Sequence, residues 1–161
     1  IKHYGDTANA PYGNKSAKEI SELTFKMADY ALSKPNHRTN ILACNTASAN
    51  LENQHAEQLQ KKYKNSGFIT MVATSVNAIS NQNAKDDLIA IFATPSTIRS
   101  GAYQEALQKN FSVITMSPKN WVKNIETAEN DNQIKSDFDS EMAAFVEQYG
   151  DKKIKQIFKW L

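Results

Sequence analysis

Residues 41–49 read Ile41-Leu42-Ala43-Cys44-Asn45-Thr46-Ala47-Ser48-Ala49, and this stretch decides the fold that we predict. A short apolar run leads into Cys44, the only cysteine, and is followed by amide, hydroxyl and small side chains. Polar sequence with helical spacing then extends from Leu51 to Tyr63. This order is typical of a buried parallel strand that ends in a turn, with a helix beginning at Thr46.

Cys44 is therefore expected at the carboxyl end of a strand, where open α/β sheets carry their chemistry. The amides and the dipole at the start of the following helix favour an anion. They can stabilise a thiolate, which is the reactive form of cysteine. The alternative is an inert buried cysteine, the more common explanation for a lone cysteine in an apolar run. The polar residues directly after Cys44 favour the reactive thiol.

Length, charge and cysteine content narrow the class of protein. The chain has 161 residues, enough for one large domain or for parts of two. Its net charge of +2 and the absence of a long basic run give no indication of nucleic-acid or membrane-surface binding. A single cysteine excludes an internal disulfide framework and is typical of a reducing compartment, so we expect a cytoplasmic protein. No apolar stretch is long enough to span a bilayer, and no signal peptide is visible.

The first part of the chain predicts one further helix. Ile1–Tyr4 looks like the end of a strand, so the sequence is expected to be a piece of a longer protein, and a loop follows over 5–14. Ser16 and Glu19 fit a capping box that opens a helix, which should end at 34–36. The apolar stripe expected on this helix consists of Ile20, Leu23, Met27 and Ala31.

The second part predicts alternating strands and helices. Strands are expected at 68–73, 88–93 and 111–115. Thr94 should cap a helix with Pro95 in its first turn. Further helices are expected at 76–81, through 103–107, at 121–125 and near the end, with a polar loop over 128–133. The apolar residues expected on the last helices are Phe138, Met142, Phe145, Val146, Ile154, Ile157, Phe158 and Leu161. This alternation predicts an α/β fold with mostly parallel sheets and helices on both faces, and a domain boundary at 65–67.

Four stretches resemble a known family. Tyr4–Ala8, Pro11–Ser16, Ala43–Ala49 and Ala93–Tyr103 are similar, in order and spacing, to motifs of the glutamate racemases of the aspartate/glutamate racemase superfamily. The resemblance covers nearly the whole chain, but the chain covers only the middle of the family's length.

The resemblance implies parts of two racemase-like α/β domains, with the site between them. Residues 1–66 would belong to the first domain, and residues 67–161 to the second. Two family segments are missing: an N-terminal strand that ends in an Asp-Ser pair, and a later strand that carries a second cysteine. The chain is expected to stop at Trp160–Leu161, within the helix that precedes that later strand.

The resemblance also implies a cofactor-independent interconversion of L- and D-glutamate, which serves peptidoglycan supply in bacteria. One thiolate removes the α-proton, and a second thiol returns a proton to the opposite face, as general acid–base catalysis. Cys44 would be one of the two thiols, so the isolated chain is expected to be inactive. No cofactor and no metal are implied, the partner is a small-molecule substrate, and a homodimer is compatible with the resemblance.

Further substrate-binding residues follow from the same resemblance. Asn45 and Thr46 match residues that hold the substrate, and Tyr12 and Gly13 match the family's Pro-Tyr-Gly loop. Each has a simpler explanation. Asn45 and Thr46 would suit plain helix capping, and an ordinary turn explains the loop.

Thr94 and Thr97 are candidates to contact the substrate with hydroxyls from the second domain. A helix that begins with Thr-Pro also explains both residues. His55 lies on an apolar helix stripe and is expected to be packed, and the three histidines show no metal-binding spacing. Arg99 is best explained as a surface residue or as one partner of a structural ion pair. The aromatic residues expected in the core or at a domain contact are Trp121, Phe138, Phe145, Phe158 and Trp160.

Two alternatives to a glutamate racemase stay open. One is an aspartate or broad-specificity amino-acid racemase, which the Pro-Tyr-Gly and Cys-Asn-Thr stretches make less favourable. The other is a non-catalytic homologue that binds acidic amino acids and has no second thiol.

Overall fold

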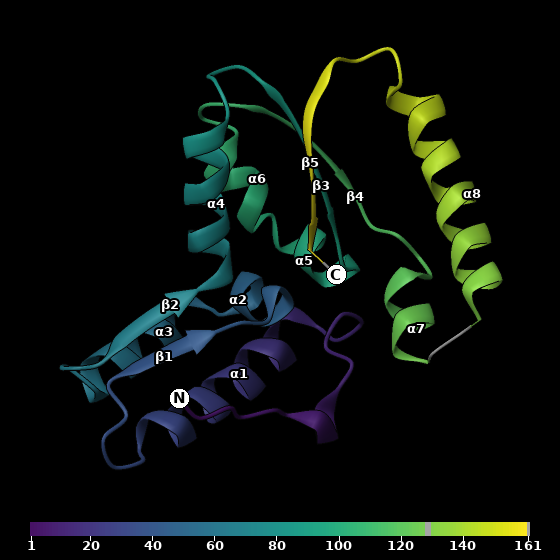
Figure 1. Cartoon of the computed structure of the whole chain (residues 1–161). Coiled ribbons are helices and arrows are strands. Elements are labelled where there is room, and N and C mark those ends of the chain that lie inside the picture. Colours follow the sequence, from purple (N-terminus) through teal and green to yellow (C-terminus); the bar gives the residue numbers. More distant parts are fainter. Residues whose placement is uncertain (128–129, 161) are drawn as a thin grey trace.

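The chain folds into two parallel sheets with helices around them (Figure 1). This computed structural model describes residues 1–127 and 130–160. In chain order the elements are η1 (Thr7–Asn9), α1 (Ala17–Leu32), β1 (Thr39–Leu42), α2 (Asn45–Asn50), α3 (Asn53–Lys62), β2 (Gly67–Thr70), α4 (Met71–Gln82), β3 (Leu88–Ala93), α5 (Pro95–Ser100), α6 (Ala102–Leu107), β4 (Ser112–Met116), α7 (Trp121–Glu126), α8 (Asp131–Tyr149) and β5 (Ile154–Trp160).

Strand β3 is the centre of the larger sheet, which has the order β4-β3-β5 with both pairings parallel. Residues 89–93 are completely buried, as expected for an apolar run covered on both faces. On one face, Ile79 of α4 and Leu107 of α6 pack against Ile89 and Ile91. The strand predicted at 88–93 is confirmed.

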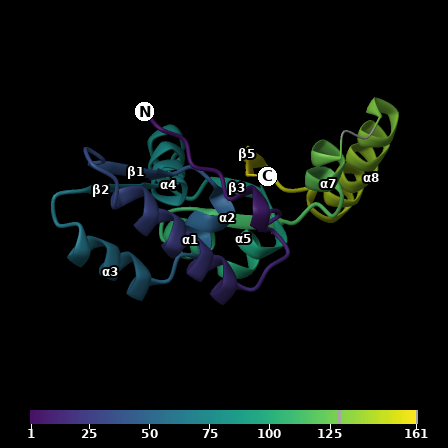
Figure 2. The same cartoon turned by 90° about the horizontal axis from the view of Figure 1, so that it is seen from below.

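Helices α7 and α8 cover the other face of this sheet. Phe92 of β3 lies 4.8 Å from Phe145 and 5.8 Å from Trp121, measured between ring centroids. Phe138 stacks on Trp121, with 4.8 Å between the centroids. The expected fold class, with parallel strands and helices on both faces, is therefore confirmed, as is the core position of Trp121 and Phe145. The side chain of Trp160 lies outside the described residues. Figure 2 shows α7 and α8 lying side by side at one end of the molecule.

The smaller sheet consists of β1 and β2, paired in parallel with Ile41 opposite Ile69. Helices α1 and α3 cover one face, where Leu32 and Leu59 form a cluster with Phe68. Ile41 and Ile69 lie on the other face and are 62% and 45% exposed. The strand before Cys44 is parallel, as predicted, but the prediction that it is buried is wrong. The reason is that no helix in the described part of the chain covers this second face.

Helix α1 begins as the capping box predicts, since Oγ of Ser16 accepts a hydrogen bond from the Glu19 amide at 3.2 Å. Its buried stripe includes Ile20 and Ala31, whereas Leu23 and Met27 are only half-buried. The other buried positions of α1 are Ser21, Thr24, Ala28 and Leu32.

The single helix predicted from Thr46 to about residue 65 is wrong, because it is two helices, α2 and α3. The break has a local cause. Oγ of Ser21 accepts a hydrogen bond from the Glu52 amide at 2.9 Å, so that amide does not continue α2. Likewise, the strand predicted at 68–73 ends at Thr70, whose side chain caps α4 by accepting from the Ala73 amide.

Both ends of the chain differ from the prediction. Ile1–Tyr4 is not a strand; the Tyr4 ring instead packs edge-on against Tyr30 of α1, with 5.7 Å between centroids. The helix predicted around Ile154 and Phe158 is wrong, because residues 154–160 form β5 beside β3. The chain therefore does not stop within a helix there, and Leu161 lies outside the described residues. Of the loop predicted at 128–133, residues 128–129 are outside the described part, and Asp131 already begins α8.

The division into two domains stays a proposal. In a division by sheets, each domain would contain one of the two sheets. Helix α4 lies between the sheets in the sequence, after β2 and before β3. Because β2 pairs with β1, a division by sheets would fall after Thr70, slightly later than the boundary at 65–67. Among the described residues, no helix is both long enough and apolar enough to cross a membrane.

Candidate functional site

Cys44 lies directly after β1 and is the N-cap residue of α2. Its sulfur is exposed and accepts a hydrogen bond from the Ala47 amide at 3.5 Å. A backbone amide in the first turn of α2 therefore points at the sulfur. The structure thus places Cys44 where the sequence predicts it. Because Cys44 itself is the N-cap, capping does not explain the amide and hydroxyl at Asn45 and Thr46.

The Cys44 side chain opens into a groove of about 920 Å³. The groove is lined by β1, by the inner side of α1 including Met27, and by the N-terminal segment with Asp6 and Tyr12. Cys44 and Tyr12 therefore line the same groove, although they are far apart in sequence. The groove offers more room than a single amino acid needs.

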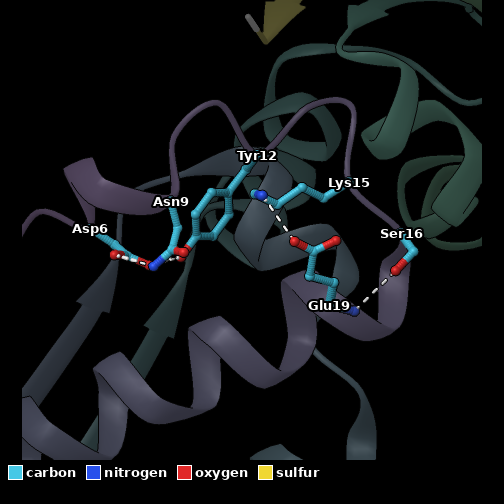
Figure 3. A network of polar contacts seen from close by, with 6 residues as sticks. All are labelled: Asp6, Asn9, Tyr12, Lys15, Ser16 and Glu19. Atoms are coloured by element: carbon cyan, nitrogen blue, oxygen red, sulfur yellow. Dashed lines mark hydrogen bonds and ion pairs between the residues drawn. The ribbon is translucent and has the colours of Figure 1, made fainter.

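Tyr12 is held by a network that sequence reasoning missed (Figure 3). Its hydroxyl donates to Oδ2 of Asp6 at 2.6 Å, and Nδ2 of Asn9 donates to both Asp6 oxygens at 2.8 and 3.0 Å. Burial raises the pKa of Tyr12 well above its usual value, with further contributions from the hydrogen bond and charge of Asp6 and from the charge of Cys44. Tyr12 is therefore a neutral phenol whose proton points to Asp6, in electrostatic reach of the thiol.

The loop that carries Tyr12 also contacts α5, the helix that follows β3 of the larger sheet. The Ser96 amide of α5 donates to the Gly13 carbonyl oxygen at 3.2 Å. A Cβ atom at Gly13 would lie 3.3 Å from Cβ of Thr94. The Gly13 backbone therefore lies close to the side chain of Thr94.

Three predicted substrate-binding threonines form one hydroxyl cluster. Oγ1 of Thr94 is hydrogen-bonded to Oγ1 of Thr46 and to Oγ1 of Thr97, both at 2.9 Å, and Thr97 donates to Thr46 at 3.4 Å. Thr94 also caps α5 through the Thr97 amide, as the simpler explanation requires. All three are buried and satisfy one another, so a substrate would have to compete with these bonds. The cluster joins α2 to α5 and so connects the two sheets.

Asn45 contacts a residue that sequence reasoning did not single out. The hydroxyl of Tyr103 in α6 donates to Oδ1 of Asn45 at 2.6 Å. Tyr103 ends the fourth stretch that resembles the family, and this was the signal available in the sequence. Hydrogen bonds between residues this far apart do not follow from spacing.

His55 and Arg99 are both expected to be structural or surface residues. Nδ1 of His55 is hydrogen-bonded to Oγ of Ser21 at 2.7 Å, and its ring stacks on Phe25, so it is packed. Arg99 is at the surface. Within residues 1–127 and 130–160, no group of histidine, cysteine and acidic residues has the arrangement of a metal site.

The curated relatives of the chain include glutamate racemases, and no family model matches the chain. The glutamate racemase of Lysinibacillus sphaericus (strain C3-41) is 36% identical over 108 residues, which are 66% of this chain and 38% of the relative. That of Clostridium botulinum (strain Alaska E43 / Type E3) is 30% identical over 127 residues, 77% of this chain and 46% of the relative. The chain thus spans less than half the length of these curated relatives.

Solved structures agree in fold. The crystal structure of glutamate racemase from Francisella tularensis, in complex with D-glutamate, has a TM-score of 0.73 and 26% identity, covering 95% of this chain and 55% of that one. The Aquifex pyrophilus enzyme has a TM-score of 0.75 at 23% identity, covering 98% and 58%. The chain therefore has an α/β fold like that of these enzymes, and its sequence is similar to part of the curated glutamate racemases.

Proposed function

We propose that the complete protein is a cofactor-independent glutamate racemase in which Cys44 is one of two acid/base thiols. The observation that carries the proposal is the Cys44 sulfur, exposed at the N-cap of α2 and open to a groove, in a homologue of glutamate racemases. The D-glutamate bound to the Francisella tularensis relative supports glutamate as the substrate.

In this proposal, Cys44 moves a proton at the substrate Cα. The Ala47 amide, which already contacts the sulfur, stabilises the thiolate. The second thiol, on the opposite face of Cα, comes from outside this 161-residue chain, which has one cysteine. The isolated chain should therefore not invert glutamate, because one rigidly held thiol reaches one face.

The substrate itself is held by residues around Cys44. Tyr12 and Gly13 offer a fixed loop, and Asn45 offers its side-chain amide. Thr46, Thr94 and Thr97 stay candidates for substrate binding, and their mutual hydrogen bonds also hold α2 and α5 in place. We further propose a site between two domains, a cytoplasmic location, a role in peptidoglycan supply, and a homodimer as an allowed assembly.

The test is the inversion of L-glutamate by the purified complete protein, followed by circular dichroism. Cys44→Ala should abolish inversion, because the thiol has no substitute. The matched control is Ser140→Ala, which removes an exposed hydroxyl on α8 and should leave the rate unchanged. Exchange of the substrate α-proton with deuterated solvent is measured in parallel. It detects removal of the proton even where the configuration at Cα is not inverted.

Other outcomes would favour the alternatives. Faster inversion of aspartate than of glutamate would identify an aspartate or broad-specificity racemase. Calorimetric binding of glutamate, without inversion or proton exchange, would identify a non-catalytic binding protein. Retention of full activity in Cys44→Ala would contradict the proposal directly.

A further inference from the structure

Tyr103 connects the core of the larger sheet to the residue beside Cys44. Its ring is 1% exposed and belongs to the cluster that includes Ile91 and Leu107. Its hydroxyl reaches out of this cluster and donates to Oδ1 of Asn45 at 2.6 Å. Asn45 is the first residue of α2 and belongs to the other sheet's side of the molecule.

This hydrogen bond determines how the Asn45 amide is oriented. Because Oδ1 is engaged by Tyr103, the amide plane is fixed and the two protons on Nδ2 point away from the phenol. None of the described residues accepts a hydrogen bond from Nδ2, and Asn45 is only half-buried. Nδ2 is thus a donor available to a ligand.

The phenol keeps its role as donor over a wide pH range. Burial raises the pKa of Tyr103 above its usual value, so the hydroxyl is protonated at neutral pH. In the structure the neutral phenol donates to Oδ1 of Asn45, so Nδ2 is turned away from the phenol. The alternative, with Nδ2 toward Tyr103, would present Oδ1 to the ligand and repel a carboxylate.

We propose that Tyr103 is a positioning residue that holds the Asn45 amide with Nδ2 ready to donate to a carboxylate of the substrate beside Cys44. This inference rests on the proposed function, and it adds a residue that acts through Asn45 and does not touch the substrate. The packed ring makes the position rigid, and the hydroxyl alone supplies the orientation.

The variant Tyr103→Phe in the complete protein removes only the oxygen and keeps the packed ring. Loss of one fixed donor should raise the KM for glutamate in both directions by up to about tenfold, with a smaller change in kcat. The matched control is Tyr63→Phe, which removes a hydroxyl that donates to the carbonyl oxygen and to Oδ1 of Asp29, at 3.1 and 2.9 Å. It should lower thermal stability without changing KM.

A double-mutant cycle distinguishes positioning from a general loss of structure. If Tyr103 acts through Asn45, then Tyr103→Phe should have no further effect on kcat/KM in an Asn45→Ala background. Additive effects of the two substitutions, or an unchanged KM in Tyr103→Phe, would overturn the inference.

A second readout keeps the inference independent of the proposed activity. If the wild-type protein does not interconvert glutamate, the proposed function fails, and the nitrogen-15 NMR signals of the Asn45 side-chain amide still test the contact. Tyr103→Phe should shift these signals and increase the amide's motion, whereas Tyr63→Phe should not. Unchanged Asn45 signals in Tyr103→Phe would overturn the positioning role.

Discussion

At the scale of single residues, the contribution of Asp6 to the raised pKa of Tyr12 can be tested by substitution. Asp6→Asn removes a negative charge and weakens a hydrogen bond that both raise the pKa of Tyr12. The Tyr12 pKa should therefore fall toward its usual value and stay above it, because burial is the largest cause. Ultraviolet absorbance titration, with Tyr12→Phe to identify the signal, measures this fall.

The raised pKa of Tyr12 also makes the stability of the protein depend on pH. Since the Tyr12 pKa is higher in the folded than in the unfolded chain, its contribution to the free energy of unfolding is fully present below the unfolded pKa of about 10. It is lost as pH rises through the folded pKa. Asp6→Asn should reduce this alkaline loss, while Asp139→Asn on the exposed side of α8 should not. An unchanged Tyr12 titration in Asp6→Asn would contradict the network of Figure 3.

A second residue-scale prediction concerns the two glycines of the N-terminal loop. Gly13→Ala places a Cβ atom 3.3 Å from Cβ of Thr94, which must yield by a few tenths of an ångström. Because Thr94 is held in the buried hydroxyl cluster, we expect a cost of about 1–3 kcal/mol. Gly5→Ala is the control, since its nearest neighbour would be Cε1 of His3 at an ordinary 3.5 Å. Urea denaturation should show a loss for Gly13→Ala alone, and equal midpoints would contradict the close approach.

The resemblance makes Cys44 and Tyr12 candidate site residues, and the strand-to-helix pattern around Cys44 supports the first of them. Residue spacing could not predict Asp6 and Tyr103, whose roles depend on hydrogen bonds. Asp6 looks like any polar loop residue, and Tyr103 like any apolar helix residue, until the fold brings their partners to them.

At the scale of elements, the threonine cluster is the contact between α2 and α5. Thr97→Val keeps the shape of the side chain but removes a buried hydroxyl, which leaves Thr94 and Thr46 with fewer partners. The free energy of unfolding should fall by about 1–3 kcal/mol. Thr74→Val is the control, because its hydroxyl donates to the Thr70 carbonyl oxygen on the exposed side of α4. Equal stability of the two variants would show that the cluster contributes nothing.

Strands β3 and β5 show what local patterns can and cannot predict. The sequence of β3 is apolar throughout, so its burial and its bounds follow from composition. The apolar residues of the final segment follow a helical spacing, at 154, 157, 158 and 161, and this favoured a helix. Parallel pairing with the completely buried β3 determines the strand instead. That pairing is a contact between distant segments, and no local window contains it.

At the scale of the whole molecule, the two sheets differ in how well they are covered. The β3 amides lie between two partner strands and under helices on both faces, whereas β1 pairs with β2 alone among the described strands. Hydrogen exchange of the 161-residue chain should therefore be slowest in β3 and faster in β1 and β2. Mass spectrometry of peptides that cover the strands measures this order. Protection of β1 equal to that of β3 would indicate that the smaller sheet is as stable as the larger.

The α/β class could be predicted from the alternation of strands and helices, but the arrangement of the two sheets could not. Contacts of Gly13 with Thr94, of Thr46 with Thr94, and of Tyr103 with Asn45 hold the sheets' helices and loops together. Each joins segments that are remote in the chain, so no periodicity reveals it.

The exposed sulfur of Cys44 has a practical consequence, because it is the chain's only thiol. A nitroxide spin label would attach at that atom alone and place its unpaired electron at the mouth of the groove. The width of its paramagnetic resonance lines would then report directly how freely the label turns there. Any molecule or chain segment that enters the groove would broaden them.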